Sequence, residues 1–243
     1  MSDGTGDTNE LVTTETRDGV LICHVDDGKA NALSSAMIER IGAAVAQAES
    51  DDGVRAVVLH GRPGKFSAGF DLSVMRGGDV AAMVDLVADG GDLVRRIYAA
   101  GVPVVAACTG HALAAGALLL LGCDVRIGAD VDCKIGLNEV AIGMTLPDWA
   151  LTIATERLSK RHLQRAIATA RITDAAGAVD AGYLDEVVPE GDVLDVAVDV
   201  AAGFAALDPG AYATTVRKLR GTTLDTMAAQ IDADRAHGRS AVL

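Results

Sequence analysis

Residues 102–127 read VPVVAACTGHALAAGALLLLGCDVRI, and this stretch contains two kinds of apolar segment. Val102–Ala107 (VPVVAA) is short and rich in β-branched residues, which predicts a strand buried on both faces. Ala115–Leu121 has no polar side, which predicts a buried helix, and a second strand begins at Val125–Ile127. Because polar and glycine residues at 109–111 interrupt the apolar run, the stretch predicts strand, helix and strand rather than a membrane span.

The same alternation runs through the preceding sequence. Gly19–Val25 is predicted as a strand, and Ser34–Ser50 as a helix that Ser34 or Ser35 caps. Val54–Leu59 (VRAVVL) predicts another strand buried on both faces, and Asp79–Ala99 another helix. Repeated strands and helices of this kind favour an α/β architecture with functional groups at the strand-to-helix turns.

The two ends of the chain differ from this core, which we expect to span residues 11–190. Residues 1–10 (MSDGTGDTNE) predict a disordered, acidic tail, and they lack the basic and apolar segments of a secretory signal, so we expect a cytoplasmic location. After Pro189, amphipathic helices are predicted over 192–207, 212–220 and 225–237. Residues 191–243 therefore predict a helical oligomerisation region with an exposed apolar stripe.

Composition limits the classes of ligand. The net charge of −13 argues against nucleic acid or an anionic membrane as a partner, because both are bound mainly through clustered Lys and Arg. Half of the residues are hydrophobic and only 3% are aromatic, so a ligand pocket is expected to be aliphatic and to suit an acyl chain. The four cysteines lack the spacing of a zinc site and are predicted to be reduced core residues.

Three stretches carry the candidate chemistry. They are Phe66–Leu72 (FSAGFDL), Gly110–Asp124 (GHALAAGALLLLGCD) and Ile135–Trp149 (IGLNEVAIGMTLPDW), in which Glu139 stands among apolar residues and glycines. Each alone has an ordinary explanation: a turn, close packing of a helix on a strand, or a buried glutamate paired with a basic residue. Their order and separation in one chain form the stronger signal.

With KANAL at 29–33, VRAVVLHG at 54–61 and AGYLDEVVPE at 181–190, these stretches resemble the crotonase, or enoyl-CoA hydratase/isomerase, superfamily over nearly the whole chain. The resemblance implies an α/β fold, a crotonase-like spiral of ββα units, followed by C-terminal helices that assemble trimers or dimers of trimers. It also implies an acyl-CoA thioester as the substrate. No separate cofactor or metal is implied, because coenzyme A is part of the substrate.

In that family two backbone N–H groups bind the thioester oxygen, and the resemblance assigns them to Ala68 and Ala115. An amide at a strand-to-helix turn and another at a helix N-terminus both direct positive dipole at one oxygen. The resemblance further implies substrate or CoA contacts from Lys29, Ala30, Arg62, Lys65, Ser67, Gly69, Phe70, Asp71, Leu72, Ala114, Gly116, Leu118 and Trp149. Arg217, Lys218 and Arg220 are expected to add basic charge from the C-terminal helices.

The acidic residues separate the activities within the family. Its hydratases use two glutamates, and this chain has Leu118 at the first position and Glu139 at the second. A leucine cannot accept a proton, whereas an isomerase needs only one base to move a double bond from position 3 to position 2. The stretch from Ile135 to Trp149 also resembles mitochondrial-type Δ3,Δ2-enoyl-CoA isomerases more than hydratases. Burial is expected to raise the pKa of Glu139.

Two other readings remain open. The chain could be another enzyme of the fold, such as a hydratase-like enzyme of fatty acid metabolism, a dienoyl-CoA isomerase or a thioester hydrolase. It could also bind acyl-CoA without transforming it. Glu139 distinguishes the second alternative, because a binding protein has no reason to bury an unpaired carboxylate beside an acyl chain.

Overall fold

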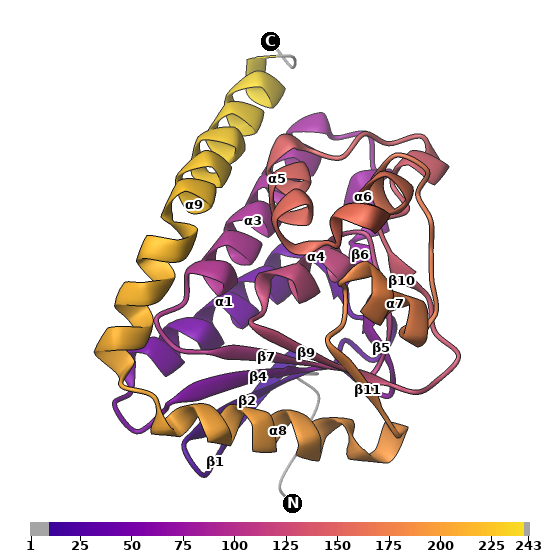
Figure 1. Cartoon of the computed structure of the whole chain (residues 1–243). Helices are drawn as coiled ribbons and strands as arrows, with labels where there is room; N and C mark the ends of the chain where they lie inside the picture. The colour runs from indigo at the N-terminus through magenta and orange to yellow at the C-terminus, as the bar shows by residue number, and fades with distance from the viewer. Residues whose placement is uncertain (1–9, 241–243) are drawn as a thin grey trace, which may run out of the picture.

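A six-stranded sheet forms the centre of the computed structural model, which describes residues 10–240, with side chains to residue 236 (Figure 1). Residues 1–9 of the predicted tail lie outside the described residues. The first strand of the sheet is antiparallel to its neighbour and the other pairings are parallel. The strands, in their order across the sheet, are β1 (Val12–Arg17), β2 (Val20–Val25), β4 (Ala56–His60), β7 (Val104–Cys108), β9 (Val125–Ala129) and β11 (Glu186–Val188).

Short strands form two smaller sheets, with the orders β10-β8-β5 and β3-β6. Their bounds are β3 (Ala32–Leu33), β5 (Gly64–Ser67), β6 (Gly69–Phe70), β8 (Gly110–Leu113) and β10 (Ile135–Gly136). Along the chain, each strand of the large sheet from β2 to β9 is followed by a strand of a small sheet and then by a helix. This repeat is the predicted series of ββα units, although the short strands themselves were not predicted.

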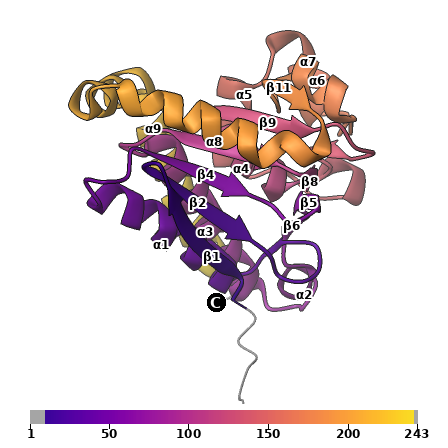
Figure 2. The same cartoon turned by 90° about the horizontal axis from the view of Figure 1, so that it is seen from below.

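Helices cover both faces of the large sheet (Figures 1 and 2). On one face lie α1 (Ser35–Ser50), α3 (Val80–Ala99) and α4 (Ala115–Gly122), and α8 (Val193–Gly203) crosses the other. Side chains of a strand alternate between faces, so Val57 and Leu59 enter the core under the first group while Val58 packs against α8. Both faces are therefore apolar, which explains the continuous apolar run AVVL at 56–59.

Capping residues fix the helix starts that the sequence predicted. The Ser34 hydroxyl accepts a hydrogen bond from the Met37 amide at 3.2 Å, and the Asp79 carboxylate accepts one from the Ala82 amide at 3.0 Å. The helices α1, α3 and α4 each begin and end within one residue of the prediction. The remaining short helices are α2 (Leu72–Met75), α5 (Asp148–Arg157), α6 (Lys160–Ile167), α7 (Ala175–Ala181), and the 3-10 turns η1 (Val140–Ile142), η2 (Glu190–Asp192) and η3 (Phe204–Ala206).

One continuous helix, α9 (Pro209–Ser240), replaces the two helices predicted after residue 211. It lies along α3 and α5 of the same chain (Figure 1) and buries Val216, Met227 and Ile231 there. The prediction that this apolar stripe is exposed is therefore wrong, because the chain covers it itself. Leu219, on another side of the helix, is 72% exposed.

A buried ion pair between Arg220 and Asp124 fastens α9 to the core. The two side chains are 9% and 13% exposed. Asp124 also accepts hydrogen bonds from the Val104 amide at 2.8 Å and the Tyr212 hydroxyl at 3.1 Å. Arg220 Nη1 donates to the Tyr98 carbonyl at 2.8 Å, and the guanidinium lies 4.4 Å from the centre of that ring. Arg220 is thus occupied inside the molecule, which corrects its expected contribution to binding CoA.

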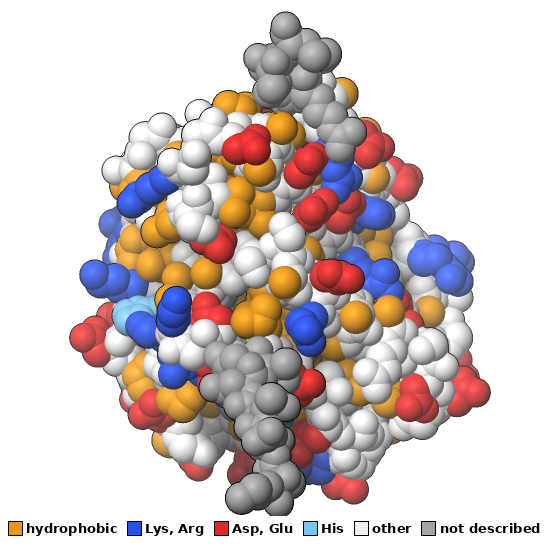
Figure 3. Space-filling view, turned by 180° about the vertical axis from the view of Figure 1, so that it is seen from behind, with side chains coloured by type: hydrophobic (Ala, Val, Ile, Leu, Met, Phe, Trp, Pro, Cys, Tyr) orange, Lys and Arg blue, Asp and Glu red, His pale blue; other side chains and the backbone are white. Residues whose placement is uncertain are grey.

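The cysteines are free and buried, as predicted. Among residues 10–240, no helix combines the length and apolar character that crossing a bilayer requires. On the face seen in Figure 3, Lys and Arg side chains are interspersed with Asp and Glu, and apolar side chains lie between them. The charge on that face is therefore mixed in sign.

Replacing Arg220 with Met should destabilise the protein by about 3–5 kcal/mol, because Asp124 would remain buried without its ion-pair partner. Denaturant unfolding measures the loss. Arg217→Met is the matched control, since Arg217 is exposed on the same helix, and it should change stability by less than about 0.5 kcal/mol. Equal effects of the two substitutions would show that the buried pair does not fasten α9.

Candidate active site

Asn31 holds the start of the candidate site in place. Its Nδ2 donates hydrogen bonds to the carbonyls of Val25 at 2.8 Å, Lys65 at 3.2 Å and Phe66 at 3.3 Å, and the Ser67 hydroxyl donates to the Asn31 carbonyl at 2.8 Å. Asn31 is fully buried with φ of 52°, a left-handed conformation that Asn adopts more readily than most residues. Sequence reasoning missed this role, although a polar amide between the small residues of KANAL was the available signal.

The amide of Ala68 is already hydrogen-bonded. It donates to the Ala30 carbonyl at 3.0 Å, and this contradicts its predicted role as a donor to the thioester oxygen. Phe70, two residues later, is paired with Leu33 in a parallel ladder, and the next amide, that of Asp71, donates to the Leu33 carbonyl at 3.1 Å. The Phe70 N–H therefore faces away from β3, because alternate amides of a strand point to opposite sides.

The first turn of α4 supplies a second group of open amides. Ala114 precedes the helix with φ of 50° and ψ of −124°, and no side chain caps the helix. The amides of Ala115 and Gly116 have no acceptor within the helix, since the first N–H groups of any α-helix lack one. A non-glycine residue in such a conformation costs about 1–3 kcal/mol, and strain of this kind gathers at functional sites. The geometry agrees with the predicted role of Ala115.

Two glycines let β5, β6 and α4 approach closely. A Cβ on Gly69 would lie 2.9 Å from the Leu113 carbonyl oxygen and 3.4 Å from the Ala115 nitrogen, and one on Gly116 would overlap the Ser67 carbonyl. Only glycine fits at such approaches. The close packing brings the amides of residues 70 and 115 onto adjoining elements.

A pair of glycines in α3 receives the aromatic side chains around the site. A Cβ on Gly90 would overlap the ring of Phe70, and one on Gly91 would lie 2.8 Å from Trp149 Cε2. Trp149 is fully buried, and Phe70 is partly buried. The Phe70 ring thus rests on the backbone of α3 while its amide faces away from β3.

Glu139 follows β10, a strand that is paired with the residues just before α4. Gly136 of β10 is paired with Leu113, and its carbonyl accepts a hydrogen bond from the Ala114 amide at 3.0 Å. Glu139 begins the turn η1, and its carbonyl accepts hydrogen bonds from the amides of Ile142 at 3.0 Å and Met144 at 2.9 Å. The backbone of Glu139 is therefore fixed three residues after Gly136, the residue of β10 that is bound to the start of α4.

The Glu139 side chain is a buried carboxyl with unused hydrogen-bonding capacity. It is 9% exposed, and its Oε2 has no hydrogen-bond partner among the described residues. Burial raises the pKa of Glu139, its own backbone amide opposes the rise, and no charged neighbour in the described part of the chain contributes. Leu118, at the position where the resemblance places the first glutamate of the hydratases, is 1% exposed in the apolar core. The structure therefore places the buried carboxyl of Glu139 after β10 and an apolar side chain at Leu118.

The three cations predicted to contact CoA differ in exposure and in whether they are already paired. Arg62 forms an ion pair with Asp26 at 3.0 Å and donates to the Lys29 carbonyl at 2.6 Å, so it fastens two loops. The Lys29 side chain is exposed, and Lys65 is partly exposed. Lys65 lies opposite His111 in the β5–β8 ladder, and the His111 Nδ1 accepts a hydrogen bond from the Lys134 amide at 2.9 Å.

Two other residues predicted to contact the substrate lie at the turn between β6 and α2. Asp71 caps α2 by accepting a hydrogen bond from the Ser73 amide at 2.8 Å, and the next residue, Leu72, is 54% exposed. The structure thus packs β5 and β6 against α4, joins Ala114 to the Gly136 carbonyl three residues before Glu139, and gives Ser67 and Asp71 structural hydrogen bonds.

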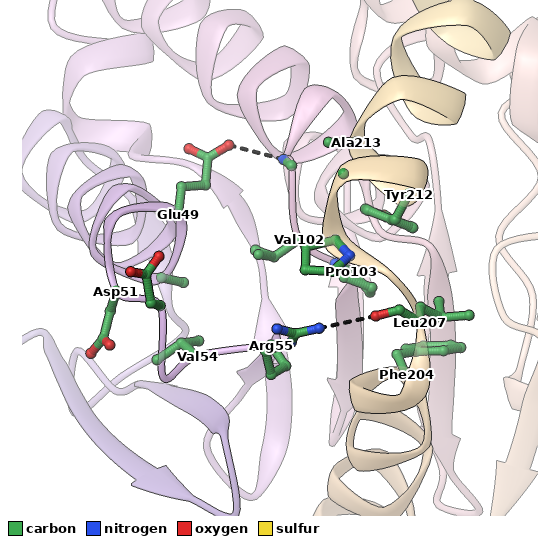
Figure 4. A pocket seen from close by; sticks show the side chains of 15 residues that line it. Glu49, Asp51, Val54, Arg55, Val102, Pro103, Phe204, Leu207, Tyr212 and Ala213 are labelled. Atoms are coloured by element: carbon green, nitrogen blue, oxygen red, sulfur yellow. Dashed lines mark hydrogen bonds between the residues drawn. The ribbon is translucent and has the colours of Figure 1, made fainter.

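A pocket of about 400 Å³ opens elsewhere, between the end of α1, the turn before β7 and the start of α9 (Figure 4). Arg55 in this pocket donates to the Leu207 carbonyl at 3.0 Å, and Glu49 accepts from the Gly101 amide at 3.0 Å. Asp51 and Asp52 add further negative charge. These carboxylates would repel the phosphates of CoA, so we do not assign the acyl-CoA site here.

Known proteins similar to this chain carry both isomerase and hydratase names. The family model described as enoyl-CoA hydratase/isomerase matches residues 15–240. A mouse (Mus musculus) protein named enoyl-CoA delta isomerase 1, mitochondrial, is 32% identical over 226 residues, which are 92% of this chain and 78% of the mouse protein. A probable enoyl-CoA hydratase of Bacillus subtilis (strain 168) is 31% identical over 213 residues, 82% of this chain and 78% of that protein.

A solved structure gives the same result for the fold. The crystal structure of an enoyl-CoA hydratase/isomerase family protein from Pseudomonas syringae superposes with a TM-score of 0.90 at 40% identity, covering 93% of this chain and 97% of that one. The predicted crotonase-like fold is therefore confirmed.

Gly90→Ala should destabilise the protein by about 1–3 kcal/mol and lower its activity, because the new methyl group displaces the Phe70 ring and with it the Phe70 amide. Thermal unfolding and steady-state kinetics measure the two effects. Gly221→Ala is the control: it lies within α9 with open space around it and should stabilise by about 0.5–1 kcal/mol. If Gly90→Ala behaved like Gly221→Ala, the packing of Phe70 on α3 would be refuted.

Glu139→Gln should raise the melting temperature at neutral pH. A carboxyl whose pKa is raised by folding contributes stability below its ordinary pKa and loses it as the pH rises through the raised value. Glutamine does not ionise, so the variant avoids that loss. The difference in melting temperature between variant and parent should close as the pH falls below the ordinary range of glutamate; a difference independent of pH would contradict the burial argument.

Proposed function

The chain belongs to the enoyl-CoA hydratase/isomerase (crotonase) family, and we propose that it catalyses the isomerase reaction, moving a double bond from position 3 to position 2 of an acyl-CoA thioester. One observation carries this choice. Glu139 is a buried carboxyl without a charged neighbour among the described residues, and the position where family hydratases have their other glutamate holds the buried Leu118.

In the proposed reaction, the Glu139 carboxylate removes a proton from C2 of the 3-enoyl thioester. The electron pair of that C–H bond forms a dienolate, whose negative charge lies largely on the thioester oxygen. The protonated Glu139 then gives the proton to C4, the double bond forms between C2 and C3, and the carboxylate is restored. The raised pKa suits this role, since an acid–base group works best when its pKa approaches the working pH.

The amides of Phe70 and Ala115 are proposed to bind the thioester oxygen, with Phe70 taking the role first predicted for Ala68. The Ala68 amide is unsuited because it donates to Ala30. Backbone donors fixed at this position stabilise the charge that develops on the oxygen, and removing one such donor typically raises the barrier by about 3–4 kcal/mol.

The exposed Lys29 and the partly exposed Lys65 are proposed to contact the phosphates of CoA, because Arg62 is already paired with Asp26. Assembly into trimers or dimers of trimers is likewise a proposal. The exposed apolar side chains of Leu72, Val140, Ile142 and Met144, from the segments around the site, support a contact surface there.

Hydration is the second candidate reaction, because some similar proteins are named hydratases. It needs a group that activates water in addition to the one that exchanges a proton with carbon, and Leu118 cannot supply it. Binding without catalysis is the third candidate. It gives no reason to keep a buried carboxyl unpaired at a cost in stability.

Glu139→Gln should lower the rate of 3-enoyl-CoA isomerisation by about 10²–10⁴-fold, because glutamine cannot accept the C2 proton. Absorbance of the conjugated 2-enoyl product measures the rate. Binding of a saturated acyl-CoA of the same length, measured by calorimetry, should stay within about threefold, since the amide replaces the carboxyl at equal size. Asp148→Asn, an exposed acid in the same stretch, is the control and should keep its activity.

The same preparations separate the rival reactions. The parent enzyme should hydrate crotonyl-CoA at least about 100-fold more slowly than it isomerises a 3-enoyl-CoA. Hydration as fast as isomerisation would favour the hydratase, and acyl-CoA binding with neither reaction would favour the binding protein.

A further inference from the structure

The strand that precedes Glu139 is bound to the segment that precedes α7. The Ile135 amide donates to the Thr173 carbonyl at 2.9 Å, and the Thr173 amide donates to the Ile135 carbonyl at 3.0 Å. At Gly136, a Cβ would lie 3.0 Å from the Arg171 carbonyl oxygen, so the two segments are in close contact. The helix α7, which starts two residues after Thr173, therefore packs against β10.

Tyr183 lies just after the end of α7. Gly182 ends α7 in the left-handed conformation, with φ of 92°, and the Tyr183 amide donates to the Ala178 carbonyl at 2.8 Å. The Tyr183 side chain is 0% exposed. Burial raises the pKa of its hydroxyl, the backbone of Leu137 opposes the rise, and Glu139 adds to it. The phenol thus lies against the short segment from Leu137 to Glu139.

Two complementary polar atoms are left without partners in this region. Tyr183 Oη and Glu139 Oε2 are both buried, and neither makes a hydrogen bond of normal geometry with a described residue; the Leu137 backbone approaches Oη but offers no acceptor that satisfies the hydroxyl proton. Buried polar atoms are nearly always paired in native proteins, with protein groups or with ordered water. A phenol hydroxyl can donate and a carboxylate can only accept, so these two atoms can satisfy each other.

We propose that Tyr183 is a positioning residue for Glu139: its hydroxyl donates a hydrogen bond, directly or through one water molecule, to Oε2 and leaves Oε1 free to exchange the proton with the substrate. The proposal rests on the isomerase function proposed above. Since Tyr183 is buried, its hydroxyl stays protonated at any pH at which the enzyme works and is always available as a donor.

The other ionisable groups around Tyr183 come from α6, α7 and the loop between them. His162, Arg165, Arg171 and Asp180 line a small pocket of about 40 Å³ that Tyr183 also lines. These side chains approach from the side of the pocket, whereas Glu139 belongs to the segment after β10. Asp180→Asn therefore serves as a test of whether a nearby charge alone changes the titration of Glu139.

Tyr183→Phe removes the hydroxyl and keeps the ring. The expected result is a fall in kcat of about tenfold or more with KM changed by less than about threefold, because the carboxylate loses a charge-assisted hydrogen bond that orients it. The acid limb of the pH–rate profile should move to higher pH, since a donor to the carboxylate favours its ionised form. Tyr98→Phe, another buried tyrosine whose hydroxyl donates to Glu156, and Asp180→Asn should leave kcat and the acid limb unchanged.

A second readout does not depend on turnover. The ¹³C resonance of the Glu139 carboxyl, assigned by its absence in Glu139→Gln, should titrate at higher pH in Tyr183→Phe than in the parent. An unchanged kcat and an unchanged titration would overturn the role of Tyr183 even if Glu139→Gln is inactive. If instead Glu139→Gln keeps full activity, the proposed function fails, and the carboxyl titration still decides whether Tyr183 contacts Glu139.

Discussion

Glu139 is a carboxyl group held in an apolar interior, with one oxygen unpartnered and no charged neighbour among the described residues. Placing such a group in the interior is unfavourable, because burial penalises its charged form and leaves hydrogen-bonding capacity unused. The same cost applies to the amides of Phe70 and Ala115, for which β3 and α4, among the described residues, offer no acceptor. The surrounding scaffold must therefore be rigid and well packed enough to hold these groups in the interior, and that requirement explains much of the local structure.

The residues that give this rigidity and close packing lie where the small sheets meet the helices. Gly69 and Gly116 permit backbone approaches that no side chain could allow, and Ala114 holds a strained conformation at the start of α4. Asn31 ties the Val25 end of β2 to β5 through three carbonyls, so β5, the strand that leads into β6 and Phe70, is fixed to the large sheet. At the far side of the molecule, the Asp124–Arg220 pair fixes α9 against α3, whose Gly90 supports the Phe70 ring.

The longer elements were predictable because their signals are local. The caps Ser34 and Asp79 and the continuous apolar strands set boundaries that the structure matches closely. The short strands β5, β6, β8 and β10 were missed, since two to four residues with glycine carry no measurable periodicity. Long-range geometry explains the errors at the site. The bond from Ala68 to Ala30, the clamp at Asn31 and the internal pairing of Arg220 each join residues distant in sequence. The burial of Glu139 and Leu118 was predictable because the environments of both residues follow from neighbouring apolar residues.

Transfer of an isotopic label within the substrate tests the central claim, that one buried carboxyl both removes and returns the proton. A 3-enoyl-CoA carrying deuterium at C2 would be isomerised in ordinary water, and the product examined by mass spectrometry and NMR. A single shielded acid–base group predicts that a substantial share of the deuterium removed from C2 appears at C4 of the product. Complete replacement by protons from solvent, with no deuterium at C4, would mean that the proton given to C4 does not come from a carboxyl shielded from water and would contradict the account.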